Sequence, residues 1–395
     1  MDNFKTPKHF LFREGAENLH LHTIFTQLGQ KTVYDSAAQC NKCAYCSRTC
    51  PAQLDAGRED KGPRARNILL RFIMEGKIDR KKNTARIKDA LSGCMLCGTC
   101  TKECFAKVPT HEHVLELERV YGQRKLPLLR RLKNKIISLN PYGLKREIKK
   151  MDFGGKGKGA FFLPSFEAKF LEVNSAVNML AAITKICGGV KVLCNDSGIY
   201  KYIYSKLPSA RKTALKLMKQ YFDADTAGNG KIITDSLDIF NFVKKYPQLF
   251  YGTENFDKAQ KFADNIYFIS DILPNLPKTK NPGKIVFTKT AAFSAEDKIF
   301  ESSIKLLAKN RQNFCPLWEG EGYPIPPLGY QYIKPKESAR YLRRKIEFIA
   351  AAQADVIVCG TLAQKRQLNK HLKKYYPKCK AIFIGDLYAD KQIDG

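Results

Sequence analysis

Eight of the thirteen cysteines form two runs with the same internal spacing. The runs consist of Cys40, Cys43, Cys46 and Cys50, and of Cys94, Cys97, Cys100 and Cys104. Each reads C-x2-C-x2-C-x3-C, which lets three thiolates wrap one tight loop around three corners of an iron–sulfur cube. Zinc sites usually use separated cysteine pairs, and cysteines that merely fill a core would not repeat these offsets. The spacing therefore predicts two [4Fe-4S] clusters.

The fourth cysteine of each run follows a longer spacer that carries its side chain off its own loop. In two-cluster proteins with this spacing, the fourth thiolate binds the neighbouring cluster. We therefore assign one cluster to Cys40, Cys43, Cys46 and Cys104, and the other to Cys94, Cys97, Cys100 and Cys50. Pro51 follows the first run and helps the chain turn away, whereas Phe105 takes the equivalent place in the second. The ligand count is the same in both runs.

The stretch between the runs must position these loops, and its pattern is helical. From Arg64 to Met74 apolar residues recur at three and four positions, with Pro63 at a plausible first helical position and Gly76 beyond the end. A second helix is expected from Asp79 to Leu91. Arg64 and Arg66 stand at the entry to the first helix. They could donate hydrogen bonds to cluster sulfurs or to backbone carbonyls, or simply belong to a solvated helix start.

These residues suggest a family. A C-x2-C-x2-C-x3-C-P run, a Gly-Pro-Arg-x-Arg helix from Gly62 to Arg66 and a second four-cysteine run resemble the iron–sulfur subunit of glycolate oxidase. The same layout is similar to relatives in lactate utilisation, glycerol-3-phosphate dehydrogenase and heterodisulfide reductase. The resemblance implies an α-helical ferredoxin-like domain, over residues 36–120, followed by two copies of a cysteine-rich α/β domain.

The C-terminal half carries a faint internal repeat at an offset near 125 residues. Residues 159–163 parallel residues 284–287, and residues 231–236 parallel residues 355–360. Each half reads as strands alternating with helices. The expected fold class is thus α plus α/β, with a duplicated α/β part at residues 159–273 and 284–395. Residues 1–35 form an N-terminal extension, residues 121–158 a basic helical connector, and residues 274–282 a linker rich in Pro and Lys.

The cysteines that mark the family's C-terminal domains are largely missing. Cys194 and Cys315 occupy the places of a Cys-Cys-Gly, and Cys359 alone survives of the later pairs. Cys187 and Cys379 lie elsewhere and are interpreted as ordinary buried thiols. We therefore expect the fold of these domains without their own iron–sulfur or zinc site.

The chain is strongly basic, with 68 Lys and Arg against 38 Asp and Glu and a net charge of +30. The density is greatest at residues 124–158, where Leu128, Leu132 and Ile136 fall on one helical face. Such a helix suits the surface of an anionic membrane where quinone is available, or an acidic partner. No nucleic-acid module accompanies it, so we do not expect nucleic-acid binding. A general lysine bias would also explain the charge.

The remaining features of the sequence bear on the cellular location of the protein and on its need for a partner. No stretch of eighteen apolar residues and no secretory signal is present, and cysteines in a reducing compartment seldom form disulfides. We expect a cytoplasmic protein, with possible peripheral association at the inner face of the membrane. His20 and His22, and His111 and His113, form pairs for which surface or capping roles are expected. No nucleotide-binding glycine motif occurs, so substrate chemistry should depend on an FAD-containing partner.

The sequence therefore predicts a non-catalytic electron-transfer subunit. Its partner would be a flavoprotein that oxidises a 2-hydroxy acid such as glycolate or lactate. The alternatives are a relay subunit for glycerol 3-phosphate or thiol/disulfide chemistry, and a redox sensor or assembly scaffold without catalytic duty.

Overall fold

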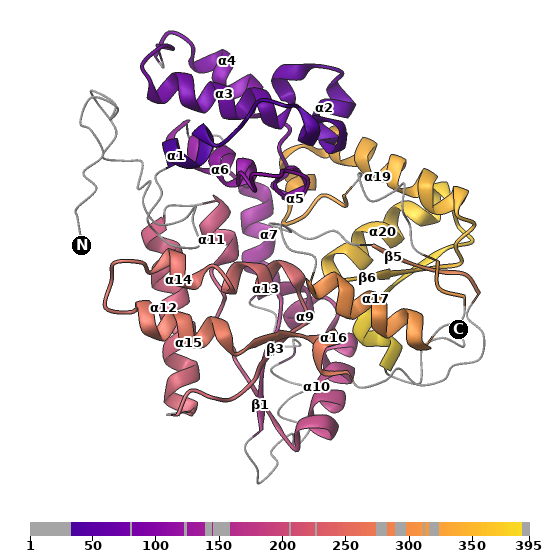
Figure 1. Ribbon diagram of the computed structural model, residues 1–395. Helices are drawn as coiled ribbons and strands as arrows, with labels where there is room; N and C mark the ends of the chain where they lie inside the picture. The colour runs from indigo at the N-terminus through magenta and orange to yellow at the C-terminus, as the bar shows by residue number, and fades with distance from the viewer. Residues whose placement is uncertain are drawn as a thin grey trace.

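The computed structural model describes residues 33–79, 81–121, 125–138, 144, 159–204, 207–225, 227–273, 283–288, 298–310, 313–315 and 324–388. Most of the expected N-terminal extension, the linker at 274–282, the pair His20 and His22 and much of the basic connector lie outside these residues. Within them the chain builds a helical part at the top of Figure 1 and two α/β parts below it.

The regular elements described within residues 33–121 are all helices, in agreement with the expected α-helical domain. The elements are α1 (Val33–Ala38), η3 (Tyr45–Thr49), α2 (Pro51–Ala56), η4 (Glu59–Lys61), α3 (Pro63–Met74), α4 (Thr84–Leu91), α5 (Thr99–Lys102) and α6 (Thr110–Tyr121). Helix α3 begins with Pro63 in its first turn and buries Leu70, Ile73 and Met74, as its spacing predicts.

Helix α4 is shorter than the sequence pattern predicts, because it begins at Thr84 rather than at Asp79. The Asp79 carboxylate accepts hydrogen bonds from the backbone N–H groups of Lys81 and Lys82 at 2.8 and 3.1 Å. An aspartate whose side chain accepts hydrogen bonds from the N–H groups two and three residues after it stabilises a turn in place of a helix. Ile87 and Leu91 are nevertheless buried, as expected.

The first α/β part contains a parallel sheet in the order β2-β1-β3-β4. Its strands are β1 (Ala160–Leu163), β2 (Val190–Val192), β3 (Ile232–Thr234) and β4 (Ile266–Phe268). The accompanying helices are α9 (Phe166–Phe170), α10 (Val173–Cys187), α11 (Ile199–Tyr204), α12 (Leu207–Ala224), α13 (Leu237–Val243), α14 (Tyr246–Leu249), α15 (Phe256–Asp264) and α16 (Ile269–Ile272). Strands β1 and β3 are buried along their whole length, as central strands of a covered parallel sheet must be.

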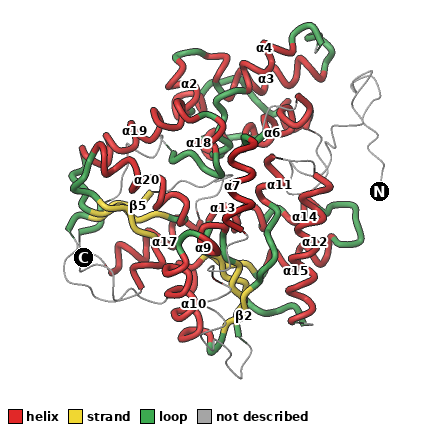
Figure 2. The backbone as a smooth tube through the Cα atoms, turned by 180° about the vertical axis from the view of Figure 1, so that it is seen from behind, coloured by secondary structure: helices red, strands yellow, loops and turns green. Residues whose placement is uncertain are grey.

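The second α/β part contains a parallel sheet in the order β5-β6-β7. Its elements are β5 (Ile285–Thr288), α17 (Lys298–Asn310), α18 (Tyr330–Ile333), α19 (Pro335–Ala351), β6 (Val356–Cys359), α20 (Leu362–Tyr375), β7 (Lys380–Phe383) and η6 (Ile384–Tyr388). An isolated parallel bridge joins Ile285 to Phe314 on the outer side of β5. Figure 2 shows the two sheets as separate groups of strands.

Polar contacts join the helical part to both α/β parts. Arg340 of α19 forms a two-pronged ion pair with Asp55 of α2, with nitrogen–oxygen distances of 2.8 and 2.7 Å. The guanidinium of Arg119 in α6 lies 4.4 Å from the ring centroid of Tyr202 in α11. The helical part is therefore held against both halves through charged side chains as well as apolar ones.

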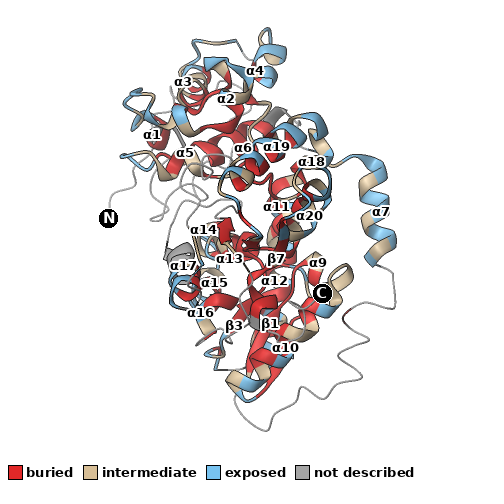
Figure 3. Ribbon diagram, turned by 90° about the vertical axis from the view of Figure 1, so that its right-hand side faces the viewer, coloured by how far each residue is buried: buried red, intermediate tan, exposed pale blue. Residues whose placement is uncertain are grey.

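Helix α7 (Leu128–Ser138) is the described helix of the basic connector. Unlike an ordinary surface helix, it exposes its apolar face to solvent. It buries none of its residues, and in Figure 3 it stands at the edge of the molecule. Leu128, Leu129, Leu132 and Ile136 are 67, 81, 48 and 69% exposed. Among the described residues, no helix has the length and apolar character to cross a bilayer.

Candidate iron–sulfur site

The two cysteine runs fold into loops with the same backbone twist. Lys42 and Ala44, on either side of Cys43, have φ values of 57° and 63°. Leu96 and Gly98, on either side of Cys97, have φ values of 61° and 78°. Non-glycine residues adopt this left-handed conformation at an energetic cost and keep it mainly at functional sites. The two runs, which have the same cysteine spacing, thus also have the same backbone conformation around the second cysteine of each run.

Each loop continues into one short helical turn that ends near the fourth cysteine. In the first run this turn is η3, and the N–H of Cys50 donates to the carbonyl of Ser47 at 3.2 Å. In the second run it is α5, and the N–H of Cys104 donates to the carbonyl of Thr101, also at 3.2 Å. Cys50 then precedes Pro51, which begins α2.

The electrostatic neighbours of Cys46 come from both runs. Burial is the main cause that raises the pKa of the Cys46 thiol to about 12, and the charges of Cys104 and Cys40 come next. Cys104, the last cysteine of the second run, thus lies close enough to affect a thiol of the first run.

The second run shows the reciprocal arrangement. Burial raises the pKa of the Cys97 thiol to about 12, against hydrogen bonds from Thr99, and the charges of Cys94 and Cys50 raise it further. Burial also raises the pKa of Cys100 well above its ordinary value, followed by the charges of Cys97, Cys50 and Cys94. Cys50, the last cysteine of the first run, therefore lies close enough to affect two thiols of the second run, as it also affects Cys46 of its own run.

The donor set fits a polynuclear iron cluster. Burial, followed by the charges of neighbouring thiols, raises the pKa of Cys46, Cys97 and Cys100, so a positive charge between the thiols would favour their thiolate forms, and a cluster core supplies it. Within the described residues, no three Cys, His, Asp or Glu side chains converge as one single-ion site would require. A cubane takes each thiolate at a separate iron corner, so its ligands stand further apart than those of one ion.

Arg66 is the charged side chain most closely tied to the second loop. It is 3% exposed and donates hydrogen bonds to the carbonyls of Ala90 and Ser92 at 3.0 and 3.1 Å. Burial lowers the pKa of Arg66, but the charges of Cys94 and other nearby thiols outweigh burial, and the net pKa is raised. Of the alternatives left open by the sequence, the backbone-carbonyl role holds for Arg66.

Arg64 differs from Arg66 although both lie in the first turn of α3. Its guanidinium donates to the carbonyl of Lys42 at 3.2 Å and pairs with Glu59 near the surface. It therefore touches the backbone of the first cysteine loop, while Arg66 anchors the chain just before the second.

Two tyrosines from the C-terminal half cover the second loop. Tyr330 of α18 and Tyr341 of α19 are 2 and 1% exposed and form one apolar group with Met95, against which Cys97 packs. Nothing in the sequence near residues 330–341 indicates this role, because the contact arises only when distant parts of the chain fold together.

His111 and His113 belong to the core, so the expected surface or capping role is wrong. His111 is 2% exposed, and its Nδ1 lies 2.9 Å from the hydroxyl of Thr101. His113 is 1% exposed, with Nδ1 2.9 Å from the Asn67 amide oxygen and Nε2 3.1 Å from the Ser36 hydroxyl. Burial lowers the pKa of His113 to about 3, so this ring stays neutral.

The C-terminal cysteines lie in different surroundings. Cys194 is exposed, Cys315 is partly buried, and Cys359 is buried at the end of β6. Cys379 is buried as predicted, but Cys187 at the end of α10 is only partly buried, so that part of the prediction is wrong.

Comparison with known proteins gives the site its class. Residues 36–108 match the family model described as a 4Fe-4S dicluster domain. The chain therefore contains a 4Fe-4S dicluster domain over this range.

Two curated proteins are similar to part of this chain. Lactate utilization protein B of an Exiguobacterium species is 30% identical over 117 residues, which cover 28% of this chain and 24% of that protein. The glycolate oxidase iron-sulfur subunit of Escherichia coli is 30% identical over 87 residues, covering 22% of this chain and 20% of that protein. The match thus spans about a quarter of the length of these relatives. It confirms the resemblance stated from the sequence, and no solved structure matches.

Proposed function

We propose that the chain is a non-catalytic electron-transfer subunit of an oxidoreductase and that it carries two [4Fe-4S] clusters. The observation that supports this most strongly is the pair of equally twisted loops whose fourth cysteines are close enough to raise the pKa of thiols in the opposite run. Once bound, each cluster supplies a one-electron carrier.

The chain's own residues would hold and tune these carriers. In this proposal Cys40, Cys43, Cys46 and Cys104 hold one cluster, and Cys94, Cys97, Cys100 and Cys50 hold the other. Arg66 fixes the backbone ahead of the second loop, and the Thr99 hydroxyl, 3.3 Å from the Cys97 sulfur, bonds to a ligand atom. Hydrogen bonds to ligand sulfurs and nearby positive charge raise the reduction potential of such sites.

The electron donor proposed is an FAD-containing subunit that oxidises a 2-hydroxy acid. Support comes from the names of similar proteins, which refer to glycolate oxidase and lactate utilization. Anaerobic affinity purification tests this proposal. Co-purification of a flavoprotein that reduces the clusters with glycolate or lactate is expected. Reduction only by glycerol 3-phosphate or a dithiol would contradict it.

We infer that the two α/β parts arose by duplication. The order β1-β3-β4 in the first sheet has its counterpart in β5-β6-β7, and the bridge from Ile285 to Phe314 occupies the place of the pairing between β1 and β2. With so few thiols retained in these halves, we propose that they act as a scaffold and carry no cluster of their own.

We further propose that α7 attaches the protein to an anionic membrane surface, near a quinone acceptor. Its exposed apolar stripe is flanked by Lys133 on one side and by Arg131 and Lys135 on the other, with no acidic residue in the helix. An apolar stripe between bases is typical of helices that lie in the headgroup region.

A further inference from the structure

The loop of the first cysteine run reaches the surface of the molecule, whereas the loop of the second run is covered. Of the eight cysteines in the two runs, all of which the structure describes, Cys43 alone is exposed. The equivalent cysteine of the second run, Cys97, is partly buried and packs against the group formed by Met95, Tyr330 and Tyr341. A cluster held by the first loop would therefore lie open to contact with another protein on the Cys43 side.

Two aromatic rings and a guanidinium adjoin the first loop. Phe105 is 83% exposed, and its ring centroid lies 5.2 Å from that of Tyr45, which is 37% exposed. The guanidinium carbon of Arg48 lies 3.6 Å from the Tyr45 ring centroid. Tyr45 and Arg48 belong to the same loop as Cys43. The three side chains thus form one continuous surface, which we call the Phe105 patch.

Phe105 does not take the structural place of its counterpart after the first run. That counterpart, Pro51, is buried and begins α2. Phe105 lies in a turn and leaves its ring in solvent, directly after Cys104, which is assigned to the same cluster as Cys43. The centres of protein–protein contacts are enriched in Tyr, Phe and Arg. The composition and exposure of the patch are therefore typical of a contact site.

The charges near the patch indicate the sign of its partner. Basic residues outnumber acidic ones in the two segments that build it, residues 40–50 and 100–107. The bases are Lys42, Arg48, Lys102 and Lys107, and the acid is Glu103. Charged side chains around a contact steer a partner of the opposite sign toward it. The occupant should therefore present acidic side chains around an apolar centre.

A protein fits the Phe105 patch better than a membrane does. Helix α5 ends at Lys102, three residues before Phe105. In Figure 3, α5 and α7 stand on opposite sides of the molecule. If α7 with its exposed apolar stripe lies on a membrane, the patch stays off that membrane and open to a protein in solution.

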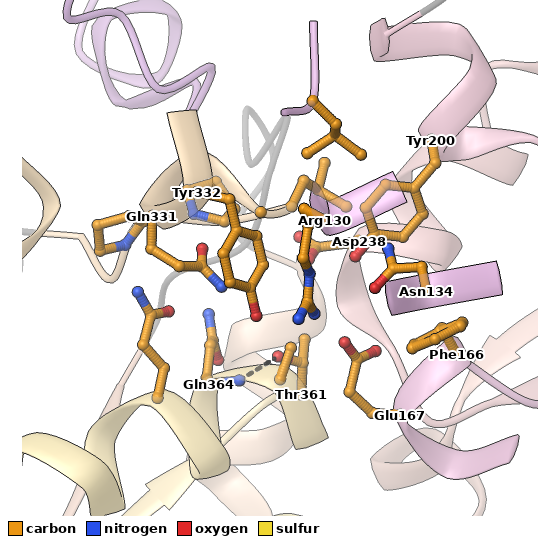
Figure 4. A pocket seen from close by; sticks show the side chains of 17 residues that line it. Arg130, Asn134, Phe166, Glu167, Tyr200, Asp238, Gln331, Tyr332, Thr361 and Gln364 are labelled. Carbon is orange, nitrogen blue, oxygen red and sulfur yellow. Dashed lines mark hydrogen bonds between the residues drawn. The ribbon is translucent and has the colours of Figure 1, made fainter. Parts of the chain in front are cut away.

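The second cysteine loop is linked to the side of the molecule that carries α7. The guanidinium carbon of Arg130 in α7 lies 3.8 Å from the ring centroid of Tyr332 in α18, and Figure 4 shows the two side chains next to each other. Tyr330 of α18 belongs to the group that covers the second loop. The first loop thus faces away from the helix proposed to lie near the acceptor, and it is the better place for electrons to enter.

We propose that an acidic flavoprotein, the electron donor of the proposed function, docks on the Phe105 patch and reduces the cluster held by the first loop. In each encounter one electron leaves the reduced flavin and one electron enters that cluster. No covalent bond or proton passes between the two proteins. A small patch is sufficient, because electron-transfer complexes are transient and bury little surface. The direction of flow rests on the proposed function, whereas the docking surface does not.

Anaerobic stopped-flow mixing of the full chain and its clusters with reduced flavodoxin, an acidic flavoprotein, tests the proposal. Cluster reduction, followed by visible absorbance, should slow at least tenfold in Phe105→Ser and in Arg48→Glu. The rate for the parent should also fall as NaCl is added, because salt screens the attraction between exposed charges.

An aromatic ring and a cation elsewhere on the surface supply the matched controls. Tyr375 at the end of α20 is 43% exposed, and the Lys374 ammonium lies 5.0 Å from its ring centroid. Tyr375→Ser and Lys374→Glu should react with flavodoxin as the parent does. Iron content and the rate of reduction by dithionite, which needs no docking, should be parental in Phe105→Ser. If that variant loses iron, Lys107→Glu takes its place, with at least threefold slower reduction expected.

Three results would overturn the proposal. They are a parental rate in Phe105→Ser with intact iron, equal slowing in Tyr375→Ser, and a rate for the parent that does not fall with salt. If Phe105→Ser keeps the parental rate but no longer sediments with phosphatidylserine vesicles, the patch is a membrane contact instead.

Failure of the two-cluster proposal has a different signature. Binding of oxidised flavodoxin to the immobilised chain requires no electron transfer, and Phe105→Ser should weaken it at least tenfold. That loss of binding in samples with only four irons per chain would contradict the two-cluster proposal and leave the docking surface standing.

Discussion

Replacing Arg66 by Met should destabilise the second cysteine loop more than the first. The change keeps the length of the side chain but removes two hydrogen bonds to buried carbonyls, those of Ala90 and Ser92. A hydrogen bond that involves a charged group contributes about 1.5 to 3 kcal/mol. For two such bonds the expected loss in unfolding free energy is therefore about 3 to 6 kcal/mol.

Arg64→Met is the matched control, since Arg64 occupies the same helical turn. Its pair with Glu59 is near the surface, where such pairs contribute about 0.2 to 1 kcal/mol. Anaerobic urea titration, followed by circular dichroism and by the iron–sulfur absorbance, measures both variants. Equal effects of the two substitutions would refute the assignment of a special anchoring role to Arg66.

The same variant should also lower one reduction potential. Removing a positive charge that lies near Cys94, Cys50 and Cys100 makes reduction of the cluster assigned to them less favourable, by on the order of tens of mV. A redox titration followed by EPR should show this change for one cluster only. Equal shifts at both clusters, or none, would contradict the geometry described around Arg66.

Three further outcomes are expected. Ala44→Gly should stabilise the protein by about 0.5 to 1 kcal/mol in urea titration, because φ is 63° at Ala44, whereas Ala52→Gly within α2 should destabilise it by a similar amount. Glu167→Gln should raise stability relative to the parent by about 1 kcal/mol more at pH 8 than at pH 6. The folded pKa of Glu167, about 7, exceeds its ordinary value, so the parent loses stability as pH rises through 7, and an equal difference at both pH values would contradict this. Leu132→Glu combined with Ile136→Glu should abolish sedimentation with anionic vesicles and leave the iron content unchanged, and retained sedimentation would exclude α7 as the membrane contact.

Local patterns in the sequence predict the parts of the site that depend on short-range geometry. The offsets of the cysteine runs are enough to predict two equivalent loops, because each loop is built from consecutive residues. Helix α3 is predicted for the same reason, with Pro63 at its start and apolar residues on one face. The late start of α4 could not be predicted, because the Asp79 side chain bonds to the backbone N–H of Lys81. Such a side-chain bond is an alternative to the backbone hydrogen bonds of a helix.

Contacts between distant segments could not be predicted. His113 resembles a surface or metal-binding residue in sequence, but Asn67 and Ser36 reach it from other helices and keep it in the core. Tyr330 covers the second cysteine loop only because two remote segments pack together. The amphipathic pattern of α7 indicates a helix but not which face it turns inward. The period of apolar residues shows which side of a helix is apolar, but it does not show what that side packs against.

The crossed assignment of the fourth cysteines is the central claim, and iron content with EPR of two double variants tests it most directly. Cys50→Ser with Cys97→Ser should remove ligands from one cluster only, so about four irons and one normal cluster should remain per chain. Cys50→Ser with Cys46→Ser should damage both clusters. The opposite pattern, in which the first pair loses both clusters and the second pair loses one, would show that each run holds its own cluster.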